Sequence, residues 1–321
     1  MKYVRLKSTD PYLNLAIEEF LFRYSDEDIF MLWQNRPSVI IGKNQNAYTE
    51  VELEYTKKAD IAVVRRITGG GAVYHDGGNV NYSFITSREK TESLDFAYFA
   101  APVIEALGGL GLTATLSGRN DILCGERKIS GNAQYSDGKR VLHHGTLLFD
   151  ADLGVLSSAL KTDIDKLKMR AIKSHKSRVA NIRELLGNDM TVDEFILHLE
   201  GHISSSMECD LSVSTDDPRL TALYERNRSD EWIYSHKTYL REYTFRAKKR
   251  FDFGTVAVEL SLNGDTVEKA AVSGDFFENS PISELEGLMI GKNLTEICDL
   301  DPSPYIHGMA KGDLSLLLRG E

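Results

Sequence analysis

Residues 65–84 read RRITGGGAVYHDGGNVNYSF, and this stretch gives the strongest indication of the fold. A β-rich run, Ile61–Ile67, ends in two arginines, three glycines follow, and a second β-rich run spans Asn79–Ile85. Glycines adopt positive φ and let a ligand approach the main chain, so successive amides of this turn can form an anion-binding nest. Arg66 beside the turn could neutralise phosphate charge. A tight turn between two strands explains three glycines equally well, so both interpretations stay open here.

The glycine turn differs from the two common nucleotide-binding loops. No GxxxxGK[ST] sequence occurs in the chain, and the turn lacks the strand–turn–helix setting of a GxGxxG loop. If this turn binds phosphate, it does so in a fold other than those that carry GxxxxGK[ST] or GxGxxG loops.

Further short strands and a few amphipathic helices surround this stretch. Asp10 and Pro11 are typical of a helix start, and apolar residues then recur at helical spacing up to Tyr24. A second helical pattern runs from Phe96 to Leu107 and stops at two glycines. The predicted strands follow one another closely: Ile29–Trp33, Ser38–Ile41, Thr113–Leu116, Lys128–Tyr135 and Arg140–Phe149. We therefore expect an α/β protein of the α+β kind, with a mixed, largely antiparallel sheet and flanking helices.

The chain is long enough for one large domain and a small companion. Thr191 and Glu194 form a capping box that predicts another helix, and a polar stretch follows near residues 241–249. Beyond it, Thr255–Leu262 and Val267–Val272 alternate as two strands across an Asn-Gly-Asp turn. We place a catalytic domain at residues 1–245 and a small α+β accessory domain at residues 246–321.

Composition excludes several classes of function. A net charge of −10 argues against nucleic-acid binding, which relies on clustered Lys and Arg, and no apolar segment is long enough to span a membrane. The three cysteines, Cys124, Cys209 and Cys298, are scattered and form no CxxC pair, and the first residues lack a signal-peptide pattern. We expect a protein of the reducing cytoplasm, without nucleic-acid or membrane partners.

Three further segments carry residues suited to binding or catalysis. Lys128 follows the polar sequence SGRND in a β-like run and could enter a pocket, although most lysines are surface residues. His143 and His144 are adjacent on a predicted strand, so their side chains point to opposite faces and make a poor metal pair. The cationic sequence IKSHKSRVANI, residues 172–182, could fold over a phosphate.

Taken together, these segments resemble the lipoate-protein ligase A family over nearly the whole chain. The RRITGGGAVYHD, GRND…RKISG, HHGTLL and KSHKSRVANI blocks occur in the order typical of that family, and VSGDFF, residues 272–277, looks like its accessory domain. The resemblance implies a catalytic domain of the biotin/lipoate ligase type. It also implies an ATP-dependent enzyme that activates lipoate or octanoate as acyl-AMP and transfers the acyl group to a lysine of a carrier.

The resemblance also implies roles for individual residues. Lys128 would contact the acyl carboxylate and the α-phosphate, Asp121 would lie near the nucleotide and its Mg²⁺, and Lys173 would belong to a loop over the adenylate. ATP and adenylate would be bound by Arg66, Gly71, Ala72, Val73 and Tyr74, and the acyl group by Trp33, Gly70 and His75. The implied carriers are lipoyl domains of 2-oxoacid dehydrogenase acyltransferase subunits or the glycine-cleavage H protein.

Two other functions remain as alternatives. An octanoyl or lipoyl transferase of the same superfamily passes the acyl group through a cysteine thioester without ATP. Cys124 is the one cysteine within a motif segment, but its apolar surroundings favour packing as a small hydrophobe. A non-catalytic module that captures nucleotides or acylated carriers is the second alternative.

Overall fold

The computed structural model describes residues 1–90, 94–118, 120–161, 178–204, 208–209, 216–234 and 243–319. Two compact units form. The first unit consists of residues 1–40, 51–64 and 73–232, and the second consists of residues 41–50, 65–72 and 233–321. The division of the sequence after residue 245 stays a prediction.

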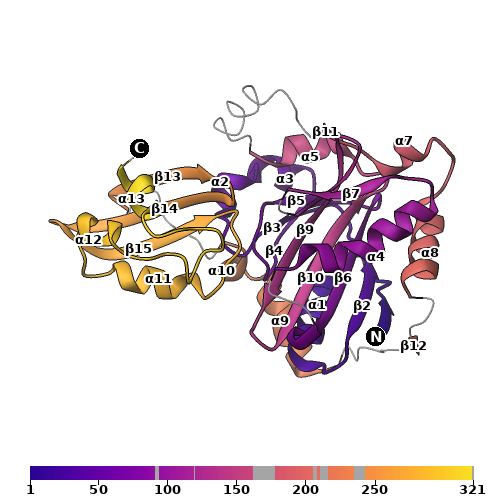
Figure 1. Cartoon of the computed structure of the whole chain (residues 1–321), viewed down its shortest axis with the longest axis horizontal. Helices are drawn as coiled ribbons and strands as arrows, with labels where there is room; N and C mark the ends of the chain where they lie inside the picture. The colour runs from indigo at the N-terminus through magenta and orange to yellow at the C-terminus, as the bar shows by residue number, and fades with distance from the viewer. Residues whose placement is uncertain are drawn as a thin grey trace. The chain divides into compact units, whose positions relative to one another are not determined.

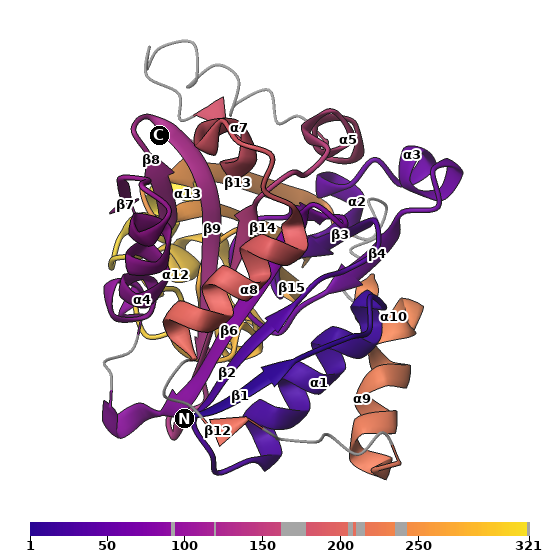
Figure 2. The same cartoon turned by 90° about the vertical axis from the view of Figure 1, so that its right-hand side faces the viewer.

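The first unit is built on one large mixed sheet (Figures 1 and 2). In the described part of the chain this sheet has nine strands, ordered β12-β1-β2-β6-β10-β9-β8-β7, with β11 paired to β9. Only the pairs β12–β1, β1–β2 and β11–β9 are parallel. The prediction of a mixed, largely antiparallel sheet is therefore confirmed. The strands are β1 (Lys2–Arg5), β2 (Ile29–Trp33), β6 (Asn79–Ser87), β7 (Ala114–Ser117), β8 (Asp121–Cys124), β9 (Arg127–Ser136), β10 (Arg140–Leu148), β11 (Arg178–Val179) and β12 (Glu208–Cys209).

Local capping sets the starts of the principal helices. The side chain of Asp10 accepts a hydrogen bond from the Tyr12 amide at the start of α1, and Asp95 caps α4 in the same way. The predicted capping box of Thr191 and Glu194 opens α8. The first unit contains α1 (Pro11–Tyr24), α3 (Leu53–Lys58), η1 (Arg88–Lys90), α4 (Phe96–Gly109), α5 (Leu153–Ala159), α7 (Ile182–Leu186), α8 (Val192–Ile203) and α9 (Pro218–Arg228); α10 (Asp230–Ile233) follows.

The two faces of the large sheet have opposite characters. Val80, Tyr82 and Phe84 of β6 pack into an apolar core with α4 and α8. The alternate residues of the same strand project to the other face, on the side of α1, which packs against α9 (Figure 2). Three of those residues, Asn79, Asn81 and Ser83, are polar although buried, whereas Ile85 is apolar. Trp33, one of the predicted site residues, lies on this polar face, because its indole contacts Ser83.

A small sheet of three strands includes the strands that precede and follow the glycine stretch in sequence. Its order is β4-β3-β5, with β3 at Ser38–Ile41, β4 at Ala62–Arg65 and β5 at Val73–His75. The strands β3 and β5 pair in antiparallel fashion, so that Ser38 lies opposite His75. The sequence GGGA is therefore a connection between β4 and β5.

The second unit contains a three-stranded antiparallel sheet with helices packed against it (Figure 1). Its strands are β13 (Phe245–Phe251), β14 (Gly254–Asn263) and β15 (Thr266–Gly274), and its helices are α2 (Ala47–Glu50), α11 (Ile282–Met289), α12 (Leu294–Cys298) and α13 (Asp313–Arg319). Gly264 has φ +60° in the predicted turn between β14 and β15, a conformation that favours glycine. The basic run near Arg246 forms β13, where Arg246 pairs with Glu259 and Arg250 with Asp275.

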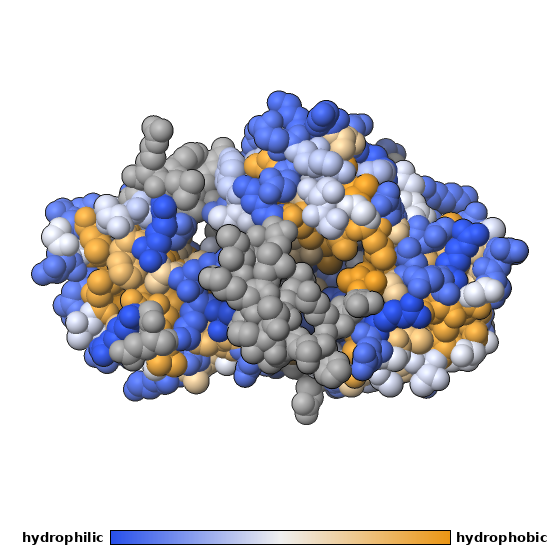
Figure 3. All heavy atoms as spheres, turned by 90° about the horizontal axis from the view of Figure 1, so that it is seen from above, coloured by the Kyte–Doolittle hydropathy of each residue, from blue (hydrophilic) through white to orange (hydrophobic). Residues whose placement is uncertain are grey.

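None of the helices in the described ranges has the length and apolar character needed to cross a bilayer. Hydrophilic residues occupy much of the face drawn in Figure 3, with hydrophobic residues in smaller areas between them.

Candidate active site

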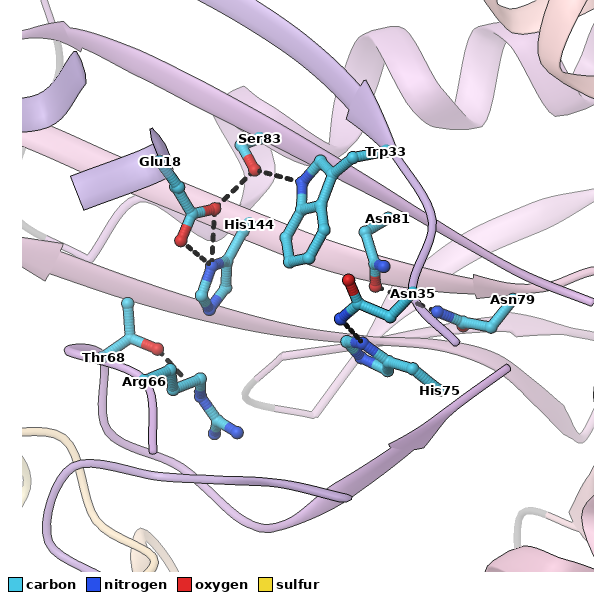
Figure 4. A network of polar contacts seen from close by, with 10 residues as sticks. All are labelled: Glu18, Trp33, Asn35, Arg66, Thr68, His75, Asn79, Asn81, Ser83 and His144. Carbon is cyan, nitrogen blue, oxygen red and sulfur yellow. Dashed lines mark hydrogen bonds and ion pairs between the residues drawn. The ribbon is translucent and has the colours of Figure 1, made fainter. Parts of the chain in front are cut away.

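The glycine turn in the second unit is organised around Arg66. Its guanidinium is almost fully buried and donates to the Thr68 hydroxyl at 2.9 Å and to the carbonyl oxygens of Gly69 and Gly71 at 2.6 and 2.8 Å. The carbonyl oxygens of Gly69 and Gly71 therefore point toward the cation, and Figure 4 shows the contact of the Thr68 hydroxyl with Arg66. Gly70, with φ +88°, supplies the conformation that the turn requires.

The same turn rests on the VSGDFF segment. The Gly70 amide donates to the Phe276 carbonyl at 3.2 Å, so this amide is not available to an anion in the observed conformation. A Cβ on Gly69 would lie 2.4 Å from that carbonyl, and a Cβ on Gly42 would lie 2.1 Å from the Gly70 carbonyl oxygen. Lys43, next to Gly42, forms an ion pair with Glu278. The VSGDFF segment, residues 272–277, therefore supports the backbone of the glycine turn.

A second buried arginine fixes the loop that faces the turn. Arg65 donates to the carbonyl oxygens of Gly42, Lys43 and Gln45 at 2.6 to 3.0 Å and to the Ile233 carbonyl. Burial, and to a lesser extent the charge of Arg66, lowers the pKa of Arg65 to about 9. The guanidinium therefore stays positive at neutral pH, and two adjacent cations make the surroundings of the turn attractive to anions.

Downstream of Ala72 the chain enters β5. Gly71, Ala72 and Val73 are partly exposed, whereas Tyr74 and His75 are buried. Burial, together with the nearby carboxylates of Asp76 and Asp152, raises the pKa of Tyr74 to about 12, so this phenol stays neutral at physiological pH. The predicted nucleotide-binding residues therefore form an accessible backbone segment followed by an anchored strand.

Lys128 lies on β9 and reaches across to the neighbouring strand. Its Nζ atom is 2.7 Å from Oδ1 of Asp121, the first residue of β8, and both side chains are about 30% exposed. A bulge makes this possible, because Ser130 pairs with Ile122 while Lys128 pairs with Leu123. A Cβ on Gly131 would lie 3.2 Å from Nζ, so the glycine leaves room for the ammonium. The two residues singled out in the sequence are thus brought together.

The strand that carries Lys128 pairs with the start of the segment 178–182. Val179 of β11 pairs with Lys128, and the Ala180 amide donates to the Lys128 carbonyl at 2.9 Å. The Asn181 side chain accepts from the Ala151 amide and donates to its carbonyl, at 3.0 and 2.9 Å. Lys173 lies outside the described residues, so the predicted adenylate loop stays a prediction.

A buried hydrogen-bond network occupies the polar face of the sheet (Figure 4). Glu18 of α1 lies 2.9 Å from Nδ1 of His144 on β10 and accepts a hydrogen bond from the Ser83 hydroxyl at 2.5 Å. The indole N–H of Trp33 in turn donates to the Ser83 oxygen at 3.0 Å. This network fixes the orientation of the Trp33 ring, one of the residues expected in an acyl pocket.

His75 is held by a second chain of amides. Asn14 Nδ2 donates to Oδ1 of Asn35 at 3.0 Å. Figure 4 shows the next contact, in which Asn35 Nδ2 lies 3.1 Å from Nδ1 of His75. The His75 and Trp33 rings meet edge to face with centroids 6.1 Å apart. Trp33 of the large sheet and His75 of the small sheet are therefore neighbours, and their place in an acyl pocket stays a prediction.

The histidine pair on β10 is separated by the sheet. His143 packs among the rings of Tyr82, Phe96 and Phe99, whereas His144 faces Glu18 on the other side. Burial lowers the pKa of His143 well below its ordinary value, so this ring is neutral. Within the described residues no group of three or more His, Cys, Asp or Glu side chains could hold a metal ion.

Cys124 packs as the sequence predicts. It ends β8 beside the turn at Gly125 and lies against the apolar core of the first unit. Its thiol is free of any disulfide.

The sequence interpretation missed the carboxylate that organises the polar face. Asn14 and Glu18 are four residues apart on α1, so both lie on the same side of the helix, and both are buried. Two polar residues four positions apart, on the side of the helix where apolar residues are expected, are the signal that could have identified Asn14 and Glu18.

Comparisons with known proteins agree on one family. The description "Lipoyl protein ligase A/B catalytic domain" matches residues 10–204, and "Bacterial lipoate protein ligase C-terminus" matches residues 241–310. The lipoate-protein ligase LplJ of Bacillus subtilis is 40% identical over 289 residues, covering 88% of this chain and 87% of that protein.

Solved structures give the same fold. LipL1 of P. falciparum, in complex with lipoate, matches with a TM-score of 0.77 and 24% identity, covering 92% of this chain and 93% of that one. A lipoate-protein ligase A bound with ATP matches with a TM-score of 0.59 and 30% identity, covering 73% of this chain and 98% of that one. The large sheet and its flanking helices are therefore those of lipoate ligases.

Proposed function

This chain belongs to the lipoyl protein ligase A/B family, and from that premise we propose that it is an ATP-dependent lipoate–protein ligase. It activates lipoate as lipoyl-AMP and transfers the lipoyl group to a lysine of a carrier domain. The observation that carries the proposal is the partly exposed Lys128 side chain, held by Asp121 on a strand that pairs with β11. The ATP and lipoate complexes of the similar ligases support the same substrates here.

In the first half-reaction a lipoate carboxylate oxygen attacks the α-phosphorus of ATP. The new C(O)–O–P linkage forms, the bond to the β-phosphate oxygen breaks, and pyrophosphate leaves with that electron pair. Negative charge on the phosphate must be stabilised while two anions approach each other. We assign this role to Lys128, because one ammonium can contact both anions and Asp121 holds it in place.

In the second half-reaction the amine of the carrier lysine attacks the acyl carbon. The amide bond forms, the bond to the phosphate oxygen breaks, and AMP leaves with its electrons. A free lysine has a pKa near 10.4, so a proton must be lost before attack. The phosphate oxygens of the bound adenylate and His75 are the two candidate acceptors.

The nucleotide phosphates are assigned to Arg66 and to the backbone of Gly71, Ala72, Val73 and Tyr74. The partial exposure of Gly71, Ala72 and Val73 and the two adjacent arginines support that assignment. Trp33, Gly70 and His75 are assigned to the acyl group. Asp121 fits a Mg²⁺ ion that arrives with the triphosphate, because such an ion needs only one or two carboxylates beside phosphate oxygens.

The acceptors proposed are lipoyl domains of 2-oxoacid dehydrogenase acyltransferase subunits and the glycine-cleavage H protein, because a ligase of this family must act on a carrier lysine. Octanoate is the alternative acid, since it matches the length of the lipoyl chain. The scattered cysteines support the cytoplasm as the compartment.

Release of pyrophosphate tests the activation step without a carrier. With Mg-ATP, the protein should release pyrophosphate in response to lipoate or octanoate, and biotin should have no effect. A folded protein that releases none with any of these acids would instead support the non-catalytic binding module.

A Cys124→Ser variant separates the ligase from a thioester transferase. We expect it to retain ATP-dependent lipoylation, because Cys124 packs against the core and a hydroxyl replaces the thiol at small cost. The measurement is the rate of carrier lipoylation with ATP, and of acyl transfer from an acylated carrier without ATP. An inactive but folded variant, with an acyl adduct on Cys124 of the wild type, would overturn the ligase assignment.

Truncation after residue 245 should impair adenylation more than transfer from preformed lipoyl-AMP. The glycine turn would lose the Phe276 carbonyl, and Lys43 would lose Glu278, so the phosphate-binding segment would lose its support. Both half-reactions are measured on the soluble truncated chain. An equal loss of the two rates would contradict this division of roles.

A further inference from the structure

The amides that hold His75 determine which of its ring nitrogens carries the proton. Asn14 Nδ2 lies 2.9 Å from the main-chain carbonyl oxygens of Ser8 and Gln34, which only accept hydrogen bonds. The nitrogen of the Asn14 amide therefore faces them, and the same nitrogen faces Asn35 at 3.0 Å. Asn35 must present its oxygen there, because two amide nitrogens would otherwise meet donor to donor.

The orientation of the Asn35 amide then determines the tautomer of the His75 imidazole. With its oxygen directed at Asn14, Asn35 presents the Nδ2 donor to Nδ1 of His75, at 3.1 Å. Nδ1 must accept this bond, so it carries no proton, and the single proton of the neutral ring lies on Nε2. Protonation of Nδ1 would set an N–H against the N–H of Asn35. All three side chains are buried, so water cannot readily replace the lost hydrogen bond.

We propose that His75 acts on the acyl group as a neutral hydrogen-bond donor through Nε2–H, with Asn35 as the positioning residue that fixes its tautomer. The role rests on the proposed function, in which His75 and the adjoining Trp33 line the acyl site. Nε2–H donates to an acyl oxygen, which is an oxygen of the bound carboxylate and then the carbonyl oxygen of the adenylate.

This assignment removes His75 from the possible general bases of the transfer step. A base needs a nitrogen with a lone pair directed at the nucleophile, and the lone pair of His75 is directed at Asn35 instead. When the lysine amine attacks, charge grows on the carbonyl oxygen, and a fixed Nε2–H stabilises that charge. The amine's proton goes to another acceptor, for which the oxygens of the leaving AMP suffice.

The first test reads the tautomer directly and does not depend on catalysis. Two-bond ¹H–¹⁵N spectra of the full-length, uniformly labelled protein distinguish protonated from unprotonated ring nitrogens in its eight histidines. The His75 signals are assigned by their disappearance in His75→Gln. We expect a protonated Nε2 and an unprotonated Nδ1 at pH 7. A protonated Nδ1, alone or together with Nε2, would overturn the proposal even if the protein is an active ligase.

The second test changes the tautomer of His75 with a substitution, Asn35→Asp, that keeps the shape of the side chain at position 35. Asn35→Asp still accepts from Asn14 but now accepts from Nδ1–H as well, which leaves Nε2 unprotonated. We expect the spectrum in alkaline buffer, where a ring paired with a carboxylate is neutral, to show this reversal. Lipoyl transfer from preformed lipoyl-AMP should fall by about 10²-fold, the usual loss when one donor at a developing charge is removed. His75→Gln, which retains an N–H donor, should be more active than His75→Phe. Faster carrier transfer by Asn35→Asp, or equal activity of the two His75 variants, would contradict the donor role.

Discussion

Lys128→Ala is expected to lower the rate of adenylate formation by at least about 10²-fold without loss of the fold. The ammonium is the cation that Asp121 orients at 2.7 Å, and the side chain is partly exposed, so it can contact a ligand. Removal leaves Asp121 as an uncompensated carboxylate at the place where phosphate charge develops, so repulsion adds to the lost attraction. The measurement is lipoate-dependent pyrophosphate release at saturating Mg-ATP, with circular dichroism to check the fold.

Lys139→Ala is the matched control for this substitution. Lys139 is an exposed lysine in the turn between β9 and β10, so it shares the hairpin of Lys128 but not the proposed role. We expect wild-type pyrophosphate release from it. Normal release by a folded Lys128→Ala protein would show that this lysine does not stabilise the phosphate.

Gly42→Ala is expected to destabilise the second unit by about 3 kcal/mol, the upper range for overpacking a rigid site. The added Cβ would lie 2.1 Å from the Gly70 carbonyl oxygen and 3.3 Å from an Arg66 nitrogen. A backbone atom cannot move aside as a flexible side chain can, so the glycine turn itself must shift. A thermal midpoint lower by about 10 °C is the measurable result.

Gly71→Ala provides the contrast within the same turn. A Cβ there meets no atom within 4 Å, so the thermal midpoint should stay close to that of the wild type. If nucleotide phosphate approaches the main chain at Gly71, the methyl group should nevertheless weaken Mg-ATP binding, measured by calorimetry. A wild-type midpoint for Gly42→Ala, or unchanged ATP affinity for Gly71→Ala, would contradict the arrangement proposed for the turn.

Local signals in the sequence were sufficient for most elements of the fold. The start of α1 follows from Asp10 and Pro11, which act within the first turn, and β2 and β3 have the bounds that their apolar runs predict. The capping box at Thr191 was also predictable, because both of its hydrogen bonds lie within four residues. Such features depend on neighbours along the chain, not on tertiary packing.

The polar face could not be predicted, because it depends on distant residues meeting. Glu18 and His144 are 126 residues apart in sequence, and they meet only when β10 pairs with β6 and α1 packs on that side. The Lys128–Asp121 ion pair likewise depends on the bulge between β8 and β9, which no sequence pattern predicts. The resemblance to a family identified Lys128 and Asp121 as site residues, but it could not supply their contact.

The contacts that support the glycine turn also could not be predicted from the sequence. The turn was interpreted as an anion-binding nest, yet the Gly70 amide is already bonded to the Phe276 carbonyl, more than 200 residues away in the sequence. The amides of the partly exposed Gly71–Val73 segment are therefore the better candidates for contact with phosphate.

The mass of a carrier domain tests the central claim most directly. An apo lipoyl domain is incubated with the protein, lipoate and Mg-ATP, and its intact mass and modified residue are measured. We predict a gain of one lipoyl group on a single lysine, dependent on ATP and lost in Lys128→Ala. A carrier that gains no mass, or that gains an acyl group from an acylated donor domain when ATP is withheld, would contradict the assignment.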